Sequence, residues 1–109
     1  MEALGALEEI VLLIILKKER CHGVEISEEY ETYMKKSISL PAIHVVLKRM
    51  EKKGLVKSEF GETTPERGGK RKRYYWASSA GYALIKELQK AKMELWFAIK
   101  EPSYQYVAG

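Results

Sequence analysis

Cysteine is nearly absent from this sequence, and its scarcity excludes two kinds of small protein. The chain of 109 residues contains one cysteine, Cys21, which cannot form a disulfide within the chain. One thiol is also too few for a structural zinc site. Because proteins without disulfides are typical of reducing compartments, we expect a cytoplasmic location. With 46% hydrophobic residues, a chain of this length can bury one core without covalent cross-links.

Long apolar runs are lacking as well. The run at residues 10–16 (IVLLIIL) is much shorter than the roughly 20 residues needed to cross a bilayer. Glu2, Glu8 and Glu9 precede it, whereas a secretory signal carries positive charge there. We therefore expect no membrane partner. The run is apolar on every side of a helix, which predicts burial on more than one side and suggests a partner subunit.

Catalytic and metal-binding patterns are also missing. Neither His22 nor His44 has a nucleophile or a paired acid at the spacing of a catalytic motif. Residues 68–71 (GGKR) lack the glycine spacing and the following Ser or Thr of a phosphate-binding loop. Cys21 and the two histidines come from separated segments without a carboxylate cluster, which is weak support for a metal sensor. The sequence predicts no enzyme, no cofactor and no metal.

The first third of the chain predicts two helices. Residues 4–19 have helical composition, and residues 21–23 break the pattern at a glycine. The second helix has apolar residues at i, i+4, i+7 and i+8 with glutamates between them, which predicts one face toward the core. These apolar residues are Ile26, Tyr30, Tyr33 and Met34.

A third helix is predicted to begin at residue 40. Ser39 is suited to cap its N-terminus, and Pro41 falls in the first turn, where a missing N–H is harmless. Gly54 ends this helix after a basic turn. Its predicted core stripe comprises Leu40, Ile43, Leu47 and Met50.

The pattern then changes to that of strands. Residues 55–60 contain strand-type side chains, residues 61–69 form a loop, and residues 73–77 alternate again as the antiparallel partner. Three helices followed by a hairpin is the order of a winged helix-turn-helix. We therefore expect an α+β fold, mainly α, with three helices and a two-stranded wing.

A long last helix completes the prediction. Ser78 is its expected N-cap and Pro102 its expected end. Its apolar residues recur by four, three, four and three, the spacing of a helix that packs on another helix. They are Leu84, Leu88, Ala91, Leu95 and Ala98.

Positive charge is concentrated in one segment. Residues 67–73 (RGGKRKR) carry five positive charges and no acid, and because the formal net charge of the chain is +4, the other residues sum to about −1. The run contains two glycines and precedes an aromatic strand, so it suggests a cationic hairpin that contacts a polyanion, foremost nucleic acid. A solvated charge run and a short nuclear-import signal are the alternatives.

The third helix offers a second contact surface, opposite its core stripe. A helix with one buried and one exposed stripe fits the major groove of B-DNA, and Ser39 can donate to a phosphate at the helix N-terminus. An ordinary amphipathic helix with a cationic last turn is the alternative. The predicted DNA-binding residues are Ser39, Pro41, Ala42, His44, Val45, Lys48, Arg67, Gly68, Gly69, Lys70, Arg71 and Arg73.

Three motifs resemble the PadR family of winged-helix transcriptional regulators, over roughly residues 4–99. The first is Leu4-Gly5 followed by Glu8 and by HGVEI at residues 22–26, and the second is SLPAIHVVLKRMEKKGLV at residues 39–56. The third is RGGKRKRYY at residues 67–75, followed by Ser78 and Gly81. The motifs resemble the family's opening, its recognition helix and its wing with the start of the last helix.

The chain departs from the usual family pattern at three positions. His44 stands where a tyrosine is common, Pro41 where a glycine is common and Ser78 where a threonine is common. The serine keeps a capping hydroxyl. The other two lie on the presumed DNA face, so the operator sequence cannot be transferred from relatives.

The resemblance implies a short-form, sequence-specific repressor that binds double-stranded DNA as a homodimer. The family dimerises mainly through the last helix, with the first helix contributing, and its two recognition helices address the half-sites of a palindrome. It implies a DNA-binding domain at residues 1–78, a dimerisation helix at residues 79–101 and a tail at residues 102–109. The implied interface residues are Leu84, Leu88, Ala91, Leu95 and Ile99.

Trp96 is a candidate ligand-binding residue. Some short-form members admit flat aromatic effectors between the subunits, and the resemblance implies that such a ligand would stack on this indole. Simple packing of Trp96 in the interface is the alternative reading.

Two other functions stay open because a fold does not fix a function. The same scaffold and basic surface would suit a protein-interaction module with an acidic partner. They would also suit a DNA-binding protein without sequence preference.

Overall fold

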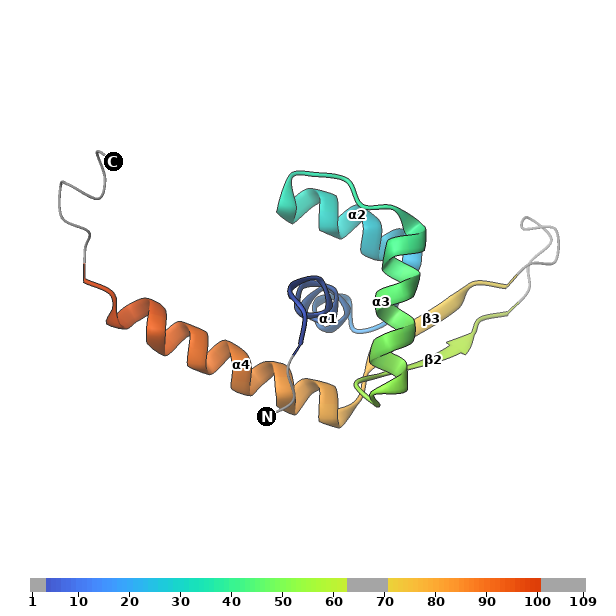
Figure 1. Ribbon diagram of the computed structural model, residues 1–109. Helices are drawn as coiled ribbons and strands as arrows, with labels where there is room; N and C mark the ends of the chain where they lie inside the picture. Colours follow the sequence, from blue (N-terminus) through green and yellow to red (C-terminus); the bar gives the residue numbers. More distant parts are fainter. Residues whose placement is uncertain (1–3, 63–70, 101–109) are drawn as a thin grey trace.

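The computed structural model describes residues 4–62 and 71–100 (Figure 1). The elements are α1 (Ala6–Lys18), β1 (Cys21–His22), α2 (Gly23–Met34), α3 (Leu40–Lys52), β2 (Val56–Phe60), β3 (Arg73–Ala77) and α4 (Ser79–Ala98). The predicted order of three helices, hairpin and long last helix is confirmed, and so is the mainly helical winged helix-turn-helix fold.

The sheet has three strands where two were predicted. β1 pairs with β3 in antiparallel register, Cys21 opposite Tyr75 and His22 opposite Tyr74, and the strand order is β1-β3-β2. The sequence prediction treated residues 21–23 only as a break between helices. Two residues are too few to show the alternation of a strand, and the partner strand lies more than 50 positions further along the chain.

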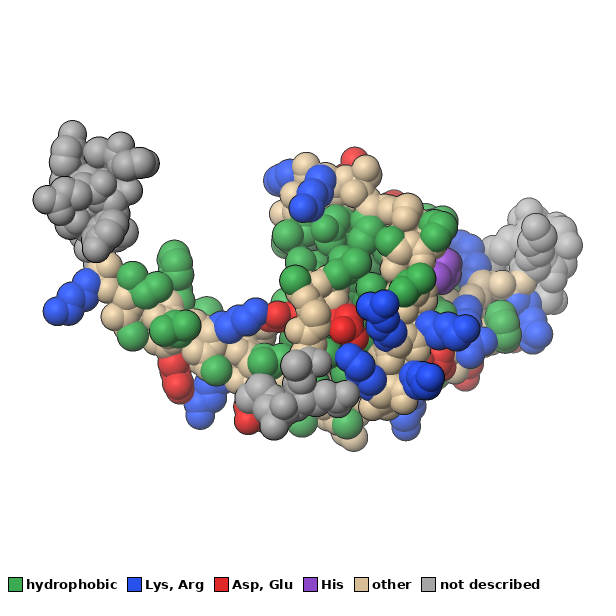
Figure 2. Space-filling view, viewed as in Figure 1, with side chains coloured by type: hydrophobic (Ala, Val, Ile, Leu, Met, Phe, Trp, Pro, Cys, Tyr) green, Lys and Arg blue, Asp and Glu red, His purple; other side chains and the backbone are tan. Residues whose placement is uncertain are grey.

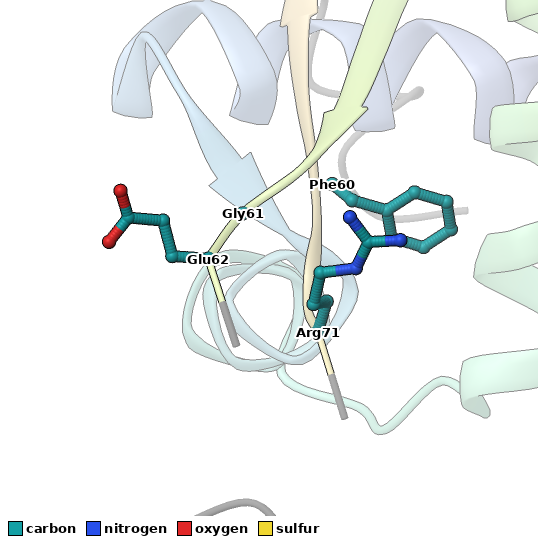
Figure 3. Close-up of a pocket in the computed structure, with 4 residues that line it drawn as sticks. All are labelled: Phe60, Gly61, Glu62 and Arg71. Carbon is teal, nitrogen blue, oxygen red and sulfur yellow. The ribbon is translucent and has the colours of Figure 1, made fainter. Parts of the chain in front are cut away.

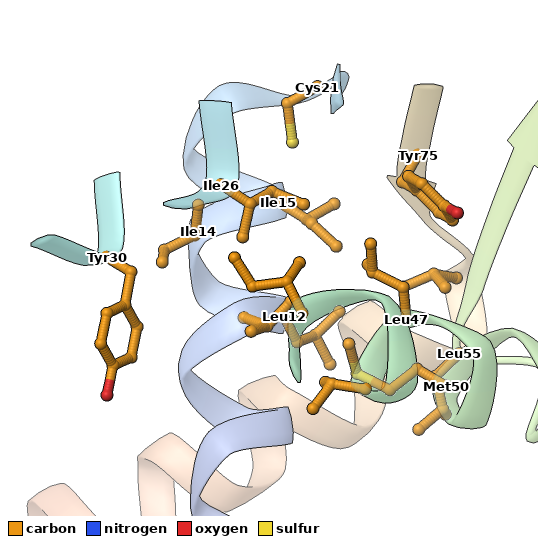
Figure 4. Packing of buried hydrophobic residues seen from close by; sticks show 14 of the residues in the cluster. Leu12, Ile14, Ile15, Cys21, Ile26, Tyr30, Leu47, Met50, Leu55 and Tyr75 are labelled. Carbon is orange, nitrogen blue, oxygen red and sulfur yellow. The ribbon is translucent and has the colours of Figure 1, made fainter. Parts of the chain in front are cut away.

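α1 lies in the centre of the hydrophobic core (Figure 4). Val11, Leu12 and Ile15 are fully buried, and α1 contacts both α2 and α3. The predicted burial of α1 on more than one side is confirmed. Leu13 is an exception, because its side chain is 38% exposed. The other fully buried side chains include Cys21, Ile26, Ile43, Leu47, Met50 and Val56.

Three residues that were assigned to core stripes are exposed. Tyr33 and Met34 lie in the last turn of α2, and Leu40 lies in the first turn of α3. All three stand at helix ends, where the neighbouring elements no longer cover the surface. Val46, which the prediction left out, is buried instead. The buried stripe of α3 therefore runs through Ile43, Val46, Leu47 and Met50.

Both predicted serine caps are present. The Ser39 hydroxyl accepts a hydrogen bond from the backbone N–H of Ala42 at 3.3 Å, and Ser78 accepts one from Gly81 at 3.0 Å. α3 ends before Gly54, which adopts φ +78°, a left-handed conformation that glycine tolerates best. These signals were predictable because each depends only on residues close in sequence.

Gly81 fixes the start of α4 against the rest of the fold. A Cβ atom built on Gly81 would overlap the carbonyl oxygen of Leu55. The Ser78 hydroxyl donates to the carbonyl of Gly54 at 2.6 Å, and the Ser78 backbone N–H donates to that of Leu55 at 3.0 Å. The serine and glycine that resembled a family motif are thus the two residues that let α4 begin in close contact with the α3–β2 turn.

α4 then extends away from the helical core, on the side opposite to the wing (Figure 1). Glu9 of α1 makes the second attachment, since its carboxylate accepts hydrogen bonds from Gln89 and Lys92 at 2.6 Å. Every residue from 91 to 99 is exposed, Lys92 included. We call residues 91–99 the arm, and α1, α2, α3 and the three-stranded sheet together the head.

Candidate nucleic-acid interface

The outer face of α3 displays most of the side chains predicted for DNA contact. Pro41, His44, Val45 and Lys48 are exposed, while Ala42 is half-buried. Val45 is 52% exposed although it is apolar, so it is available for a partner. Figure 2 shows lysine and arginine side chains gathered over this face of α3 and continuing toward the wing.

Ser39 is also exposed, but its hydroxyl already has a structural role as the acceptor of the helix cap. A hydroxyl keeps its own proton when it accepts. Ser39 can therefore cap α3 and still donate to an anion at the start of the helix.

The wing presents an arginine that is held by an aromatic ring. The Arg71 guanidinium lies 4.8 Å from the ring centroid of Phe60, and the two side chains border a shallow hollow with Gly61 and Glu62 (Figure 3). Phe60 is about half exposed. The ring limits the conformations of the guanidinium before any partner binds, which lowers the entropic cost of a contact.

Arg73 is held more firmly by the protein itself. Its Nε donates to the Ser58 hydroxyl at 2.9 Å, its Nη2 lies 3.7 Å from the Glu51 carboxylate, and its guanidinium also stacks on Phe60 at 4.7 Å. Part of its charge is therefore already paired. Of the two described wing arginines that were predicted to bind DNA, Arg71 has the greater exposure.

Four further predicted contacts lie outside the described residues. Arg67, Gly68, Gly69 and Lys70 belong to the segment 63–70, between the two strands of the hairpin. Their assignment to the wing tip stays a prediction.

A second hollow separates α3 from the beginning of β3. It has a volume of about 170 Å³ and its lining includes His22, Gly23, His44, Lys72 and Arg73. The His44 ring lies directly over Gly23, so that a Cβ on Gly23 would come within 3.2 Å of the ring. In Figure 2 a histidine side chain is visible between α3 and the lysines and arginines of the wing.

Sequence reasoning missed His22 and Lys72 as members of this site. The His22 Nε2 atom is 3.2 Å from the Lys72 Nζ atom, across 50 positions of sequence. It is also 3.4 Å from a Glu25 carboxylate oxygen. The glycine after His22 was the one local signal, because it gives the neighbouring α3 space to approach.

The residues predicted for a subunit interface divide into two groups. Leu84 and Leu88 are half-buried, and Leu84 packs against the core of its own chain. Ala91, Leu95 and Ile99 are exposed in the arm. The large apolar side chains of the arm, Met93, Leu95, Trp96, Phe97 and Ile99, are 50–74% exposed.

An apolar groove lies on the head, between α1 and the end of α2. It measures about 320 Å³, and Ile10, Leu13, Ile14, Tyr33 and Met34 form its apolar lining. Lys17 lies at its edge, with its ammonium 5.4 Å from the centroid of the Tyr33 ring. Leu13, the exposed large apolar residue of α1, is part of the lining of this groove.

The Cys21 side chain is an unreactive part of the core. Burial raises the pKa of its thiol to about 11, so the thiolate is scarce at neutral pH. Within residues 4–62 and 71–100, no three His, Cys, Asp or Glu side chains come together in a way that could hold a metal ion. None of the described helices has the length and apolar character to cross a membrane.

Comparison with known proteins gives a consistent picture. A family model described as the transcriptional regulator PadR-like family matches residues 11–87. A PadR-like transcriptional regulator from Bacillus cereus is 23% identical, with a TM-score of 0.70 over 86% of this chain and 87% of that chain. A PadR family regulator from Clostridium difficile is 27% identical, with a TM-score of 0.63 over 81% of this chain and 88% of that chain.

A transcriptional regulator from Clostridium thermocellum is similar as well. It is 26% identical, with a TM-score of 0.66 over 81% of this chain and 82% of that chain. No functionally curated protein matches the chain.

Proposed function

Since the chain belongs to the PadR-like family of transcriptional regulators, we propose that it is a repressor that binds a palindromic operator as a homodimer. One observation carries this proposal. The exposed face of α3 and the beginning of β3 border the same hollow, so one DNA duplex can contact both. An acidic protein partner would account for the positive charges of α3 and the wing, but not for the exposed apolar side chain of Val45 on the same face of α3.

The two elements would divide the work. Arg71 of the wing, preoriented by Phe60, would neutralise a backbone phosphate, which gives affinity without sequence preference. Ala42 and Val45 would read bases, because small apolar side chains contact the methyl group of thymine in the major groove. His44 and Lys48 would add polar contacts along the same face. Specificity therefore rests on α3 and affinity on the wing.

The proposed dimer rests on two apolar surfaces that residues 4–62 and 71–100 leave uncovered. The side chains of Trp96 and Phe97 are 67% and 74% exposed and point to different sides of the arm. An arm with apolar residues on several sides needs more than one covering surface. In the proposed dimer, the arm and the α1 groove of the partner subunit supply these two covering surfaces. Two recognition helices would then address half-sites about 34 Å apart.

A small aromatic effector is part of the same proposal. Its support is the exposed indole of Trp96, a flat surface on which an aromatic ligand would stack. Such a ligand would release DNA only if it bound more tightly to an arrangement of the two heads that does not fit the operator.

Selection of duplexes from a random pool, followed by mobility-shift measurements at physiological salt, tests the function. We expect an enriched palindrome that binds at least about 10³-fold more tightly than random DNA. Arg71→Ala should weaken binding to all sequences and reduce the slope of log affinity against log salt by about one. Val45→Ser should change which sequences are enriched. Lys90→Gln, which removes an exposed charge from α4, is the control for lost charge.

The outcomes separate the two rival functions. A specificity ratio near one with a steep salt dependence would identify a DNA-binding protein without sequence preference. Absence of DNA binding would favour a protein-interaction module. Either result would exclude an operator-specific repressor.

A further inference from the structure

The hollow between α3 and β3 holds an unusual contact between two basic groups. The Lys72 ammonium and the His22 Nε2 atom are 3.2 Å apart. As a hydrogen bond, this contact has the ammonium as its donor and an unprotonated Nε2 as its acceptor. In that state the imidazole is neutral, and Lys72 is tied to His22.

Protonation of His22 would reverse this contact. A doubly protonated ring has no lone pair for Lys72, and two cations at this distance repel. The Glu25 carboxylate oxygen, 3.4 Å from the same Nε2, is then placed to accept a hydrogen bond from the protonated ring. Lys18 lies 3.8 Å from the other Glu25 oxygen, which keeps the carboxylate in position.

Other groups also line the hollow or contact His22. Arg73 enters from β3 and His44 from α3, and the Tyr74 ring meets the His22 ring edge-on at 5.5 Å. The Glu25 carboxylate contacts His22 directly. A protonated His22, a released Lys72 and Arg73 would place three positive charges around one small space.

The size and position of the hollow indicate what would fill it. A volume of about 170 Å³ is below the 300–1,000 Å³ range typical of pockets for whole small molecules, so the hollow admits one small group. Its lining combines the apolar Val24 and Leu40 with four basic side chains, His22, His44, Lys72 and Arg73, and these favour an anionic occupant. The hollow lies between the two elements that the proposed function places on DNA. The sugar-phosphate backbone of a DNA strand that runs from the face of α3 to the wing would pass over the hollow.

We propose that the hollow lined by His22, His44, Lys72 and Arg73 binds one phosphate of the DNA backbone, and that protonation of His22 releases Lys72 to this phosphate. The proposal rests on the proposed DNA-binding function. It adds a contact that neither the recognition helix nor the wing tip supplies. It also makes DNA affinity depend on pH near neutrality, because ligand binding and proton uptake are reciprocal.

The chain makes this dependence easy to isolate. Its only two histidines are His22 and His44, both of which line the hollow. Imidazole is the side chain that ordinarily titrates between about pH 5 and 8. A change in DNA affinity over this interval therefore reports on the hollow.

The experiment measures binding of the selected duplex by fluorescence anisotropy, at constant ionic strength, between about pH 7 and about pH 5.5. We expect wild-type affinity to rise about tenfold as the pH falls, the effect of roughly one bound proton. His22→Gln should lose most of this rise. Lys72→Met should bind more weakly at the lower pH and lose about one unit of salt slope. Lys90→Gln should keep the wild-type pH dependence.

Circular dichroism checks that His22→Gln is folded, and Lys72→Met serves as the independent variant because it removes no buried residue. If both variants keep the wild-type pH dependence while still binding the duplex, the phosphate hollow is wrong and the proposed function stands. If no duplex binds at either pH, both fail.

A second measurement identifies the source of the phosphate. The imidazole C–H resonances of His22 and His44 should shift saturably when the duplex is added. Inorganic phosphate alone, at matched ionic strength, should not reproduce the saturation. Equal saturation by inorganic phosphate would overturn the DNA backbone as the occupant.

Discussion

The head and the arm of this protein are both rich in apolar side chains, but they differ in what covers them. Core residues of the head such as Leu12, Leu47 and Met50 are fully buried, whereas the large apolar residues of the arm are at least half exposed. The contrast shows that the described part of one chain covers the core of the head but not the apolar residues of the arm. Exposed apolar area of this kind marks an interaction surface.

The boundary between head and arm lies inside one continuous helix. Gly81, which lies close to Leu55, and Lys92, which pairs with Glu9, attach α4 to the head. No such attachment is found in the described helix beyond Lys92. A change at the Gly81 attachment and a change in the exposed arm should therefore have different effects.

The largest effect is expected where α4 is attached to the head. Gly81→Ala would place a methyl group against the Leu55 carbonyl, and backbone atoms cannot yield as a flexible side chain can. We expect a loss of about 3 kcal/mol in the free energy of unfolding, at the upper end of overpacking effects. Chemical denaturation at low protein concentration measures it.

Ala80→Ser is the matched control, since Ala80 is an exposed neighbour in the same turn of α4. It should change stability by less than about 0.5 kcal/mol. Equal stability of both variants would show that α4 is not held by its close approach to Leu55.

The sequence predicted the head well wherever the signal was local. Ser39 and Ser78 were identified as caps because a cap depends on residues three positions away. The strand β1 and the contact of His22 with Lys72 were missed, because each depends on a partner about 50 positions distant. A local sequence pattern cannot identify contacts between residues that lie so far apart along the chain.

The candidate site shows the same limit. The exposed face of α3 could be predicted from helical periodicity, and the structure places Pro41, His44 and Val45 on that face. Alternation could not show that Arg73 is paired with Ser58 and Glu51, or that Phe60 holds Arg71. Those pairings arise from the register of β2 with β3, which turn chemistry in residues 61–69 does not specify.

A smaller effect is expected from the arm, and on association instead of folding. The paired change Leu95→Ala with Phe97→Ala removes two exposed apolar side chains. If a second copy covers them, the dimer should be weakened by about 2 kcal/mol, or roughly 30-fold in its dissociation constant. Sedimentation at several protein concentrations measures this change.

The unfolding of the isolated subunit provides the contrast with the head. The same paired variant should keep its stability at low concentration to within about 0.5 kcal/mol, because both side chains are mostly exposed in the single chain. Glu94→Gln, an exposed change in the same segment, should leave the dimer intact. A paired variant that remains fully dimeric would rule out the arm as the interface.

The smallest effect distinguishes two neighbouring carboxylates of α1, Glu8, which is paired inside the head, and Glu9, which pairs with Lys92 of the arm. Glu8 is 7% exposed and accepts hydrogen bonds from the Gly5 N–H at 3.1 Å and from Lys53 at 3.0 Å. Burial alone would raise the pKa of Glu8, but these two partners outweigh burial and lower it. We expect Glu8→Gln to cost about 1 kcal/mol in the free energy of unfolding at pH 7.

The pH dependence of Glu8→Gln identifies the cause. Because the pKa of Glu8 is lower in the folded state than the ordinary value of 4.5, its charge stabilises the fold above that value. This contribution disappears as the pH falls through the folded pKa, so wild type and Glu8→Gln should converge in acid and stay separated from pH 5 upward. Glu9→Gln removes an ion pair whose lysine is 57% exposed, and it should cost less. Urea denaturation at a series of pH values measures both, and a constant difference between wild type and Glu8→Gln down to about pH 2 would mean that Glu8 acts through packing and not through its charge.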